Sequence, residues 1–303
     1  MNLTTFLNAM PGAVAQGMIW GIMAIGVFIT YKVLDYSDLT VDGTMATGGA
    51  VCIMLMMNGV NTYLALLCAV LAGMLAGLVT GLFHTAMGIP PILAGILTQL
   101  SLYSINLTIM GGKANQAVSV SKYNLLVSSR YVRELSLQNP ILITFLVLVV
   151  LIAVLYWFFG TELGCSLRAT GANAAMSRAQ GINTNLCKIL GLMVANGIVA
   201  LASAMYSHYQ GFVDVNMGRG AIVIGLAAVI ISDVIFGKLF RNFALKLFAV
   251  AIGAVIYYMV IQVVLWLGLN TNLLKLLSAL IVALFLAIPF WKSKLRVRRK
   301  GGR

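Results

Sequence analysis

The run NPILITFLVLVVLIAVLYWFF, residues 139–159, decides the fold class of this chain. It carries no charged side chain, and about 20 consecutive apolar residues let a helix cross the hydrocarbon core of a bilayer. The sequence therefore predicts an all-α, polytopic membrane domain over residues 1–291, with about nine transmembrane helices. The predicted spans are roughly 12–34, 43–60, 62–84, 88–110, 139–159, 188–210, 220–237, 247–268 and 272–291.

The composition supports a membrane protein. Of 303 residues, 61% are hydrophobic and only 9% are charged, whereas a soluble domain needs a charged surface. The net charge of +13 comes from basic residues in loops and in a basic tail, residues 292–303. No basic patch is interleaved with stacking aromatics, so we do not expect nucleic-acid binding. The four cysteines form neither a CxxC motif nor a Cys/His cluster with zinc spacing, so we expect no metal site.

The segment TELGCSLRATGANAAMSRAQGINTNLCK, residues 161–188, is polar and basic between two apolar spans. Gly171 permits a sharp turn, and Asn173 can cap a short helix that ends at Ala179. Gly181 can then close this helix in the left-handed conformation. So short a helix is not stable alone, which predicts a cytoplasmic partner at this position. The alternative is a well-capped surface loop.

Basic residues in short loops set the orientation of a membrane protein. They mark the tail 292–303, the loop 238–246 and the segment 161–188, and all three are predicted to be cytoplasmic. The N-terminus and the loop 111–138 then lie outside, although that loop also carries four basic residues.

Two stretches hint at an internal repeat. DLTVDGTMATG, residues 38–48, resembles DVNMGRGAIVIG, residues 214–225, because each places an aspartate and a short polar piece before an apolar half. Interrupted helices at matching places in two halves point to a transport site near the membrane midplane. We predict two interrupted helices in a possible inverted repeat, unless these acids are ordinary helix N-caps at the interface. The pathway candidates here are Asp38, Thr40, Asp42, Gly43, Asp214, Asn216 and Arg219.

The fourth span begins with GIPPILAG, residues 88–95, where proline is tolerated in a first helical turn. Its second half carries several polar side chains, among them Tyr103 and Asn106. These two residues are further candidates for a pathway lining, and helix packing is the alternative. Small residues at four-residue spacing allow close helix packing, within one subunit or between subunits. They are Gly17 and Gly21 in the first span and Gly73, Gly77 and Gly81 in the third.

No enzymatic constellation is present in the sequence. His84 and His208 are far apart in the chain, and there is no HExxH, no nucleophile elbow and no GxxxxGK[ST] phosphate loop. The sequence therefore predicts no catalytic residue and no ATP binding through a phosphate loop of its own.

Several of these motifs resemble one family. GCSLRATGAN, residues 164–173, with GIN at 181–183, is similar to the coupling loop of bacterial ABC-importer permeases of the branched-chain amino acid and ribose type. DLTVDG at 38–43, GIPP at 88–91 and DVNMGRG at 214–220 look more specifically like the tryptophan/tyrosine-type permeases. The resemblance covers roughly residues 12–291.

The resemblance implies a permease in the bacterial inner membrane that pairs with a second permease subunit, giving a homodimer. A cytoplasmic ABC ATPase would bind the ATP, so this chain needs no cofactor, and an extracytoplasmic binding protein would deliver the substrate. The classical importer loop carries a glutamate-alanine-alanine signature, and Asn173-Ala174-Ala175 stands near that place in this chain. The residues expected to couple to the ATPase are Arg168, Gly171, Asn173, Ala174, Ala175, Arg178 and Gly181.

The expected function is ATP-driven import of a small organic solute, with an amino acid favoured over a sugar or nucleoside. A secondary transporter driven by protons or ions is the alternative, with Asp38, Asp42 and Asp214 as its ion sites. A scaffold subunit without a pathway is a third hypothesis.

Overall fold

A computed structural model describes residues 3–119, 123, 125–132, 138–237, 239–240, 242–267 and isolated positions between 276 and 287. Within this part of the chain, seven helices are long and apolar enough to cross a membrane, against about nine predicted. The predicted span 272–291 lies largely outside the described residues, and the tail 292–303 lies entirely outside them.

The structure contains long helices and several shorter elements between them. The long helices are α1 (Leu3–Phe28, continued by the π-helical turn Ile29–Val33), α2 (Thr40–Met57), α3 (Thr62–Thr85), α4 (Pro91–Ile109), α5 (Pro140–Gly160), α8 (Thr184–Gln210) and α10 (Phe243–Trp266). The shorter elements are β1 (Asn115–Ala117), the 3-10 turn Ser129–Tyr131, α6 (Glu162–Ala172), α7 (Ala174–Ala179), β2 (Phe212–Asp214) and α9 (Ala221–Phe236).

Asparagine starts several of these helices. Asn61, Asn139, Asn183 and Asn242 each accept a hydrogen bond from a backbone N–H in the first turn of α3, α5, α8 and α10, respectively. Such caps satisfy amide groups that have no partner within the helix. The sequence therefore fixes these helix starts locally, next to apolar runs long enough to span the bilayer.

Two helices start in the interior instead of at an end of the bundle. Residues 34–39 are non-helical and precede α2, and Asp38 within them is buried. Residues 215–220 likewise precede α9, which is only 16 residues long. Non-helical segments therefore stand directly before α2 and α9.

The glycine stripes pack helices together within this chain. In α3, Gly73 and Gly77 lie against the backbone of Asn196 and Leu192 of α8. In α1, Gly17 and Gly21 lie against Val255 and Ala251 of α10. Small residues allow this close approach of backbones, so these stripes serve packing within one subunit.

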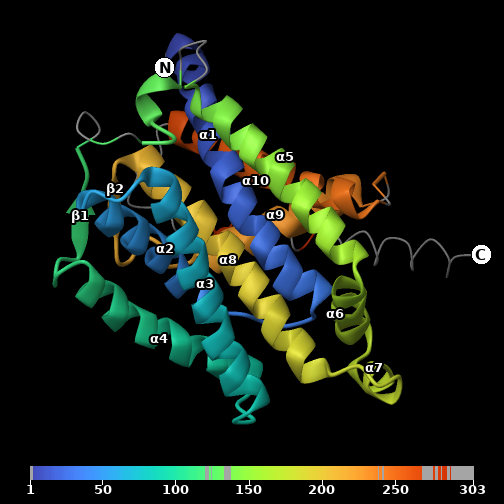
Figure 1. Cartoon of the computed structure of the whole chain (residues 1–303). Coiled ribbons are helices and arrows are strands. Elements are labelled where there is room, and N and C mark those ends of the chain that lie inside the picture. Colours follow the sequence, from blue (N-terminus) through green and yellow to red (C-terminus); the bar gives the residue numbers. More distant parts are fainter. Residues whose placement is uncertain are drawn as a thin grey trace, which may run out of the picture.

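The bundle has two different ends, as Figure 1 shows. The N-terminus lies at one end, and α6 and α7 lie at the other. At the N-terminal end, β1 pairs antiparallel with β2, with Asn115 opposite Asp214. The predicted all-α fold therefore carries one small two-stranded sheet. At the α6 end, the Arg168 guanidinium lies over the Phe243 ring at 5.5 Å. This contact places the segment 161–188 and the start of α10 at the same end, as predicted.

Candidate functional site

The starts of α2 and α9 meet inside the bundle, and we call residues 38–43 and 218–222 together the helix junction. Asp42, in the first turn of α2, accepts hydrogen bonds from the backbone N–H of Gly220 (2.9 Å) and of Ile222 (3.0 Å). The residue that precedes α9, Gly220, has a φ of 86° and no side chain to cap the helix. Asp42 therefore caps α9 from a position 178 residues earlier in the chain.

Asp38 fixes the start of α2. One carboxylate oxygen accepts from the Thr40 backbone N–H (2.9 Å), and the other accepts from the Asn196 Nδ2 amide (2.7 Å). The Asn196 amide oxygen in turn accepts from the Thr44 hydroxyl (2.7 Å). All four residues are buried. A buried carboxyl is costly unless it is hydrogen-bonded, and this cluster provides those bonds between α2 and α8.

Threonine hydroxyls extend the buried network to α3 and α4. Thr40 Oγ1 lies 2.7 Å from Thr80 Oγ1, and Thr80 Oγ1 donates to Thr98 Oγ1 at 2.9 Å. The three side chains are buried. The first turn of α2 is therefore tied by polar contacts to α3, α4 and α8, away from lipid.

Gly43 and Asn106 bring α2 and α4 together. Asn106 Nδ2 donates to the Gly43 carbonyl at 3.4 Å, and a methyl group on Gly43 would lie 3.0 Å from Leu102 and 3.1 Å from the Gln99 Cα. The buried Asn106 Oδ1 has no hydrogen-bond partner. Such an unpaired buried acceptor is uncommon, so Asn106 stays a candidate for the pathway lining.

The other predicted pathway residues lie apart from these contacts. Tyr103 and Arg219 are exposed. Asp214 lies at the end of β2, where its carboxylate accepts from the Asn216 backbone N–H (2.6 Å). It does not cap α9, because Asp42 supplies that cap. Asn216 Oδ1 is buried without a hydrogen-bond partner.

The segment 161–188 forms two helices, which we call the basic segment. Asn173 accepts from the Met176 backbone N–H (3.0 Å) at the start of α7, and Gly181 has a φ of 82° beyond its end. These observations confirm the predicted short helix. Ala175 and Arg178 are exposed on it, while Ser177 is buried. The basic segment thus presents a short, ordered surface at the end of the bundle.

The helix α6 was not predicted. Thr161 accepts from the Gly164 backbone N–H at its start, and a threonine followed by Glu162 is a capping signal that could have been recognised. Gly171 does not make the predicted sharp turn, because it lies inside α6. A methyl group there would collide with the Val33 carbonyl oxygen, so the glycine allows α6 to lie against the end of α1.

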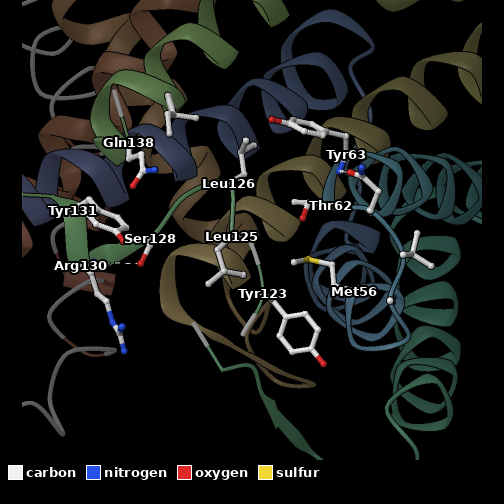
Figure 2. A pocket seen from close by; sticks show the side chains of 14 residues that line it. Met56, Thr62, Tyr63, Tyr123, Leu125, Leu126, Ser128, Arg130, Tyr131 and Gln138 are labelled. Atoms are coloured by element: carbon white, nitrogen blue, oxygen red, sulfur yellow. Dashed lines mark hydrogen bonds between the residues drawn. The ribbon is translucent and has the colours of Figure 1, made fainter. Parts of the chain in front are cut away.

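A wide cleft of about 940 Å³ opens at the end of the bundle opposite the basic segment, and no sequence signal predicted it. Figure 2 shows Tyr131 and Gln138 on one side, Tyr63 on the other, and Leu125 and Leu126 between them. The cleft therefore combines aromatic, amide and apolar side chains. Among the described residues, no group of three or more His, Cys, Asp or Glu side chains could hold a metal ion.

Several apolar helices long enough to span a membrane indicate a multi-pass membrane protein. A family model for the permease component of branched-chain amino acid transport systems matches residues 10–295. The chain belongs to this family. It is therefore a multi-pass translocation subunit of the ABC type, a class that works with an ATPase and a binding protein.

Three relatives are similar over most of the chain. The tyrosine transport system permease protein of Clostridioides difficile (strain R20291) is 37% identical over 281 residues, which cover 93% of this chain and 91% of that protein. An uncharacterized protein of Rickettsia prowazekii (strain Madrid E) is 32% identical and covers 93% and 98%. A fructose import permease protein of Bifidobacterium longum (strain NCC 2705) is 24% identical and covers 81% and 67%. No solved structure gives a significant match.

Proposed function

We propose that this chain is the permease of an ATP-driven importer for an amino acid, with the aromatic class favoured. The observation that carries the proposal is α7, a capped helix of six residues that is exposed at one end of the bundle. So short a helix needs a partner for its stability. The named tyrosine permease relative supports the substrate class, and the fructose permease relative is more distant.

The coupling contact would be made by the basic segment. Arg168 and Arg178 give its exposed surface positive charge, and Ala174 and Ala175 keep the first turn of α7 small enough to enter a groove. Residues with short side chains allow close approach of a partner helix. ATP binding would close the partner ATPases and move this segment relative to the rest of the bundle.

The orientation follows if the ATPase binds there. The basic segment and the loop 238–246 would face the cytoplasm, and the N-terminus would lie outside. The tail 292–303 would be cytoplasmic through its basic residues. The cleft lined by Tyr63 and Tyr131 would then face the side from which a binding protein delivers substrate.

Two features support an inverted repeat that alternates access. Helix α3 packs on α8 and α1 packs on α10, so each half contributes one helix to each close pair. The interrupted helices α2 and α9 meet at Asp42 and Gly220. Transporters with such repeats place their substrate site where the half-helices meet. We propose a homodimer in which the helix junctions line the pathway.

Charge reversal on α7 tests the coupling contact. In the reconstituted importer, Ala175→Glu with Arg178→Glu should abolish co-purification of the ATPase and ATP-driven uptake. Arg130→Glu makes the same charge change as Arg178→Glu alone, but at the opposite end of the bundle, and should leave co-purification intact. If both ATPase binding and uptake survive the α7 changes, the coupling assignment is wrong.

A further inference from the structure

We propose that residues Leu34 to Asp42, which we call the connecting segment, transmit movement of α6 to the start of α9. This inference rests on the proposed function, because it assumes that the ATPase moves the basic segment. It adds a physical route from α6, at one end of the bundle, to the start of α9, inside the bundle. Six residues of extended chain, 34–39, span at most about 20 Å, and the segment has a defined contact at each end.

The first contact is with α6. Gly171 lies against the backbone of Val33, and a methyl group there would be 2.9 Å from the Leu34 Cα. Leu34 itself is buried, and its side chain would lie 2.9 Å from a methyl group on Gly191 of α8. Backbone-to-backbone contact leaves no flexible side chain to absorb a displacement. A shift of α6 therefore displaces the beginning of the connecting segment.

The middle of the segment is held by two buried side chains, Tyr36 and Asp38. Tyr36 is buried, and its hydroxyl donates to the Pro91 carbonyl at 3.4 Å. Asp38 is held by the Asn196 amide at 2.7 Å. Contacts with α4 and α8 thus hold residues 36–38 in a fixed conformation between α6 and α2.

The last contact is with α9. Asp42 accepts from the backbone N–H of Gly220, which precedes α9, and of Ile222 in its first turn, and α9 has no side-chain cap of its own. A methyl group on Gly218 would collide with the Asp42 carbonyl oxygen, so backbone also meets backbone here. Moving Asp42 must therefore either move the start of α9 or break its cap. Asp42 and Gly171 are positioning residues at the two ends of one route.

Hydrogen exchange of the permease–ATPase complex, with and without a non-hydrolysable ATP analogue, tests the route. In the unmodified chain, ATP should change exchange both in residues 174–180, where the ATPase binds, and in residues 218–226 at the start of α9. In Asp42→Ala, residues 174–180 should still respond, while the response at 218–226 should be lost. Uptake should fall about tenfold, the size of a typical coupling loss.

Three further variants complete the design. Asp42→Asn keeps one acceptor oxygen and should restore part of the response at 218–226. Gly171→Ala inserts a methyl group between α6 and Val33 and should also suppress that response. Gly160→Ala is the matched control, because a methyl group there meets nothing within 4 Å, and it should behave like the unmodified chain.

The outcomes separate the two proposals. If 218–226 still responds to ATP in both Asp42→Ala and Gly171→Ala, movement takes another route, such as α8, and the inference is overturned. If 174–180 does not respond in the unmodified chain, the ATPase does not bind there and the proposed coupling fails. Should Gly171→Ala fail to fold, the comparison of Asp42→Ala with Asp42→Asn still decides the matter.

Discussion

The starts of α2 and α9 are held in different ways. The start of α2 is fixed by several buried partners, because Asp38 bonds to the Thr40 backbone and to Asn196, and Thr40 continues the network to Thr80. The start of α9 depends on one side chain from another element, Asp42. The sequences before α2 and α9 look alike, but the start of α2 is anchored by several buried side chains, whereas the start of α9 is held by one side chain of another helix.

The difference suggests how one bundle can be stable and still switch. A buried, fully paired network resists rearrangement, since breaking any bond leaves an unsatisfied group. A helix end with a single external cap can be released at the cost of that cap. We infer that the start of α2 moves as one unit with the side chains bonded to it, and that the start of α9 follows this unit only while the Asp42 cap is intact.

Removing the α2 anchor should have the largest effect. Asp38→Ala leaves the Thr40 N–H and one N–H of the buried Asn196 Nδ2 without an acceptor, while Nδ2 keeps its bond to the Leu192 carbonyl, and this should cost roughly 3 kcal/mol of unfolding free energy. Equilibrium unfolding in mixed micelles measures it. Asp38→Asn retains one acceptor oxygen and should lose about half as much. Equal, small losses for both variants would contradict the anchoring role.

Alanine substitution of one tightly packed glycine in each helix compares the packing of α2 with that of α9. A methyl group on Gly48 of α2 would lie 2.6 Å from the Ala200 Cα, whereas one on Gly225 of α9 would lie 2.6 Å from the Val27 side chain. Backbone cannot yield as a side chain can, so Gly48→Ala should cost about 2–3 kcal/mol and Gly225→Ala about 1 kcal/mol. The same unfolding assay compares them, and the reverse order would contradict tighter packing of α2.

Loss of the α9 cap should act locally. Asp42→Ala should weaken the first turn of α9 by about 1 kcal/mol, which raises amide exchange near Gly220 and Ile222 about fivefold. Exchange in the first turn of α2 should stay within twofold of the unmodified chain, about the experimental scatter. Hydrogen exchange of the permease without nucleotide measures both regions. Equal increases in amide exchange at the starts of α2 and α9 would contradict the proposal that the two helix starts are held differently.

The C-terminal end of α9 should be the region least sensitive to substitution. Lys32 and Asp233 form an ion pair at 2.7 Å, with exposed fractions of 51% and 44%. Exposed pairs contribute little and are screened by salt. Lys32→Ala should change the unfolding free energy by less than about 0.5 kcal/mol. A larger loss, persisting at high salt, would show that the C-terminal end of α9 is anchored after all.

Local signals predicted part of this site. The cap at Asn173 and the left-handed Gly181 bound α7 within nine residues, so the helix could be recognised in sequence. The apolar runs likewise predicted six of the seven long helices to within four residues at each end, whereas α1 starts at Leu3, nine residues before its predicted start. By contrast, Gly171 was misread because a glycine that permits a turn looks the same as a glycine that allows close packing.

Long-range pairings could not be predicted. Asp42 and Gly220 are 178 residues apart, and nothing in either local sequence specifies the other. Asn196 gave only a weak signal, a polar residue within an apolar span, although polar groups at membrane depth usually have a partner inside the bundle. The choice of Asp42 over Asp214 as the cap of α9 follows from tertiary packing alone.

The most direct test is the energy source of uptake. The chain should be reconstituted in liposomes with its ATPase and binding protein, and tyrosine accumulation measured with ATP in the presence of a protonophore. We predict that accumulation requires ATP hydrolysis and persists with the protonophore. Accumulation without ATP, driven by a proton gradient and abolished by the protonophore, would contradict the assignment as an ATP-driven permease.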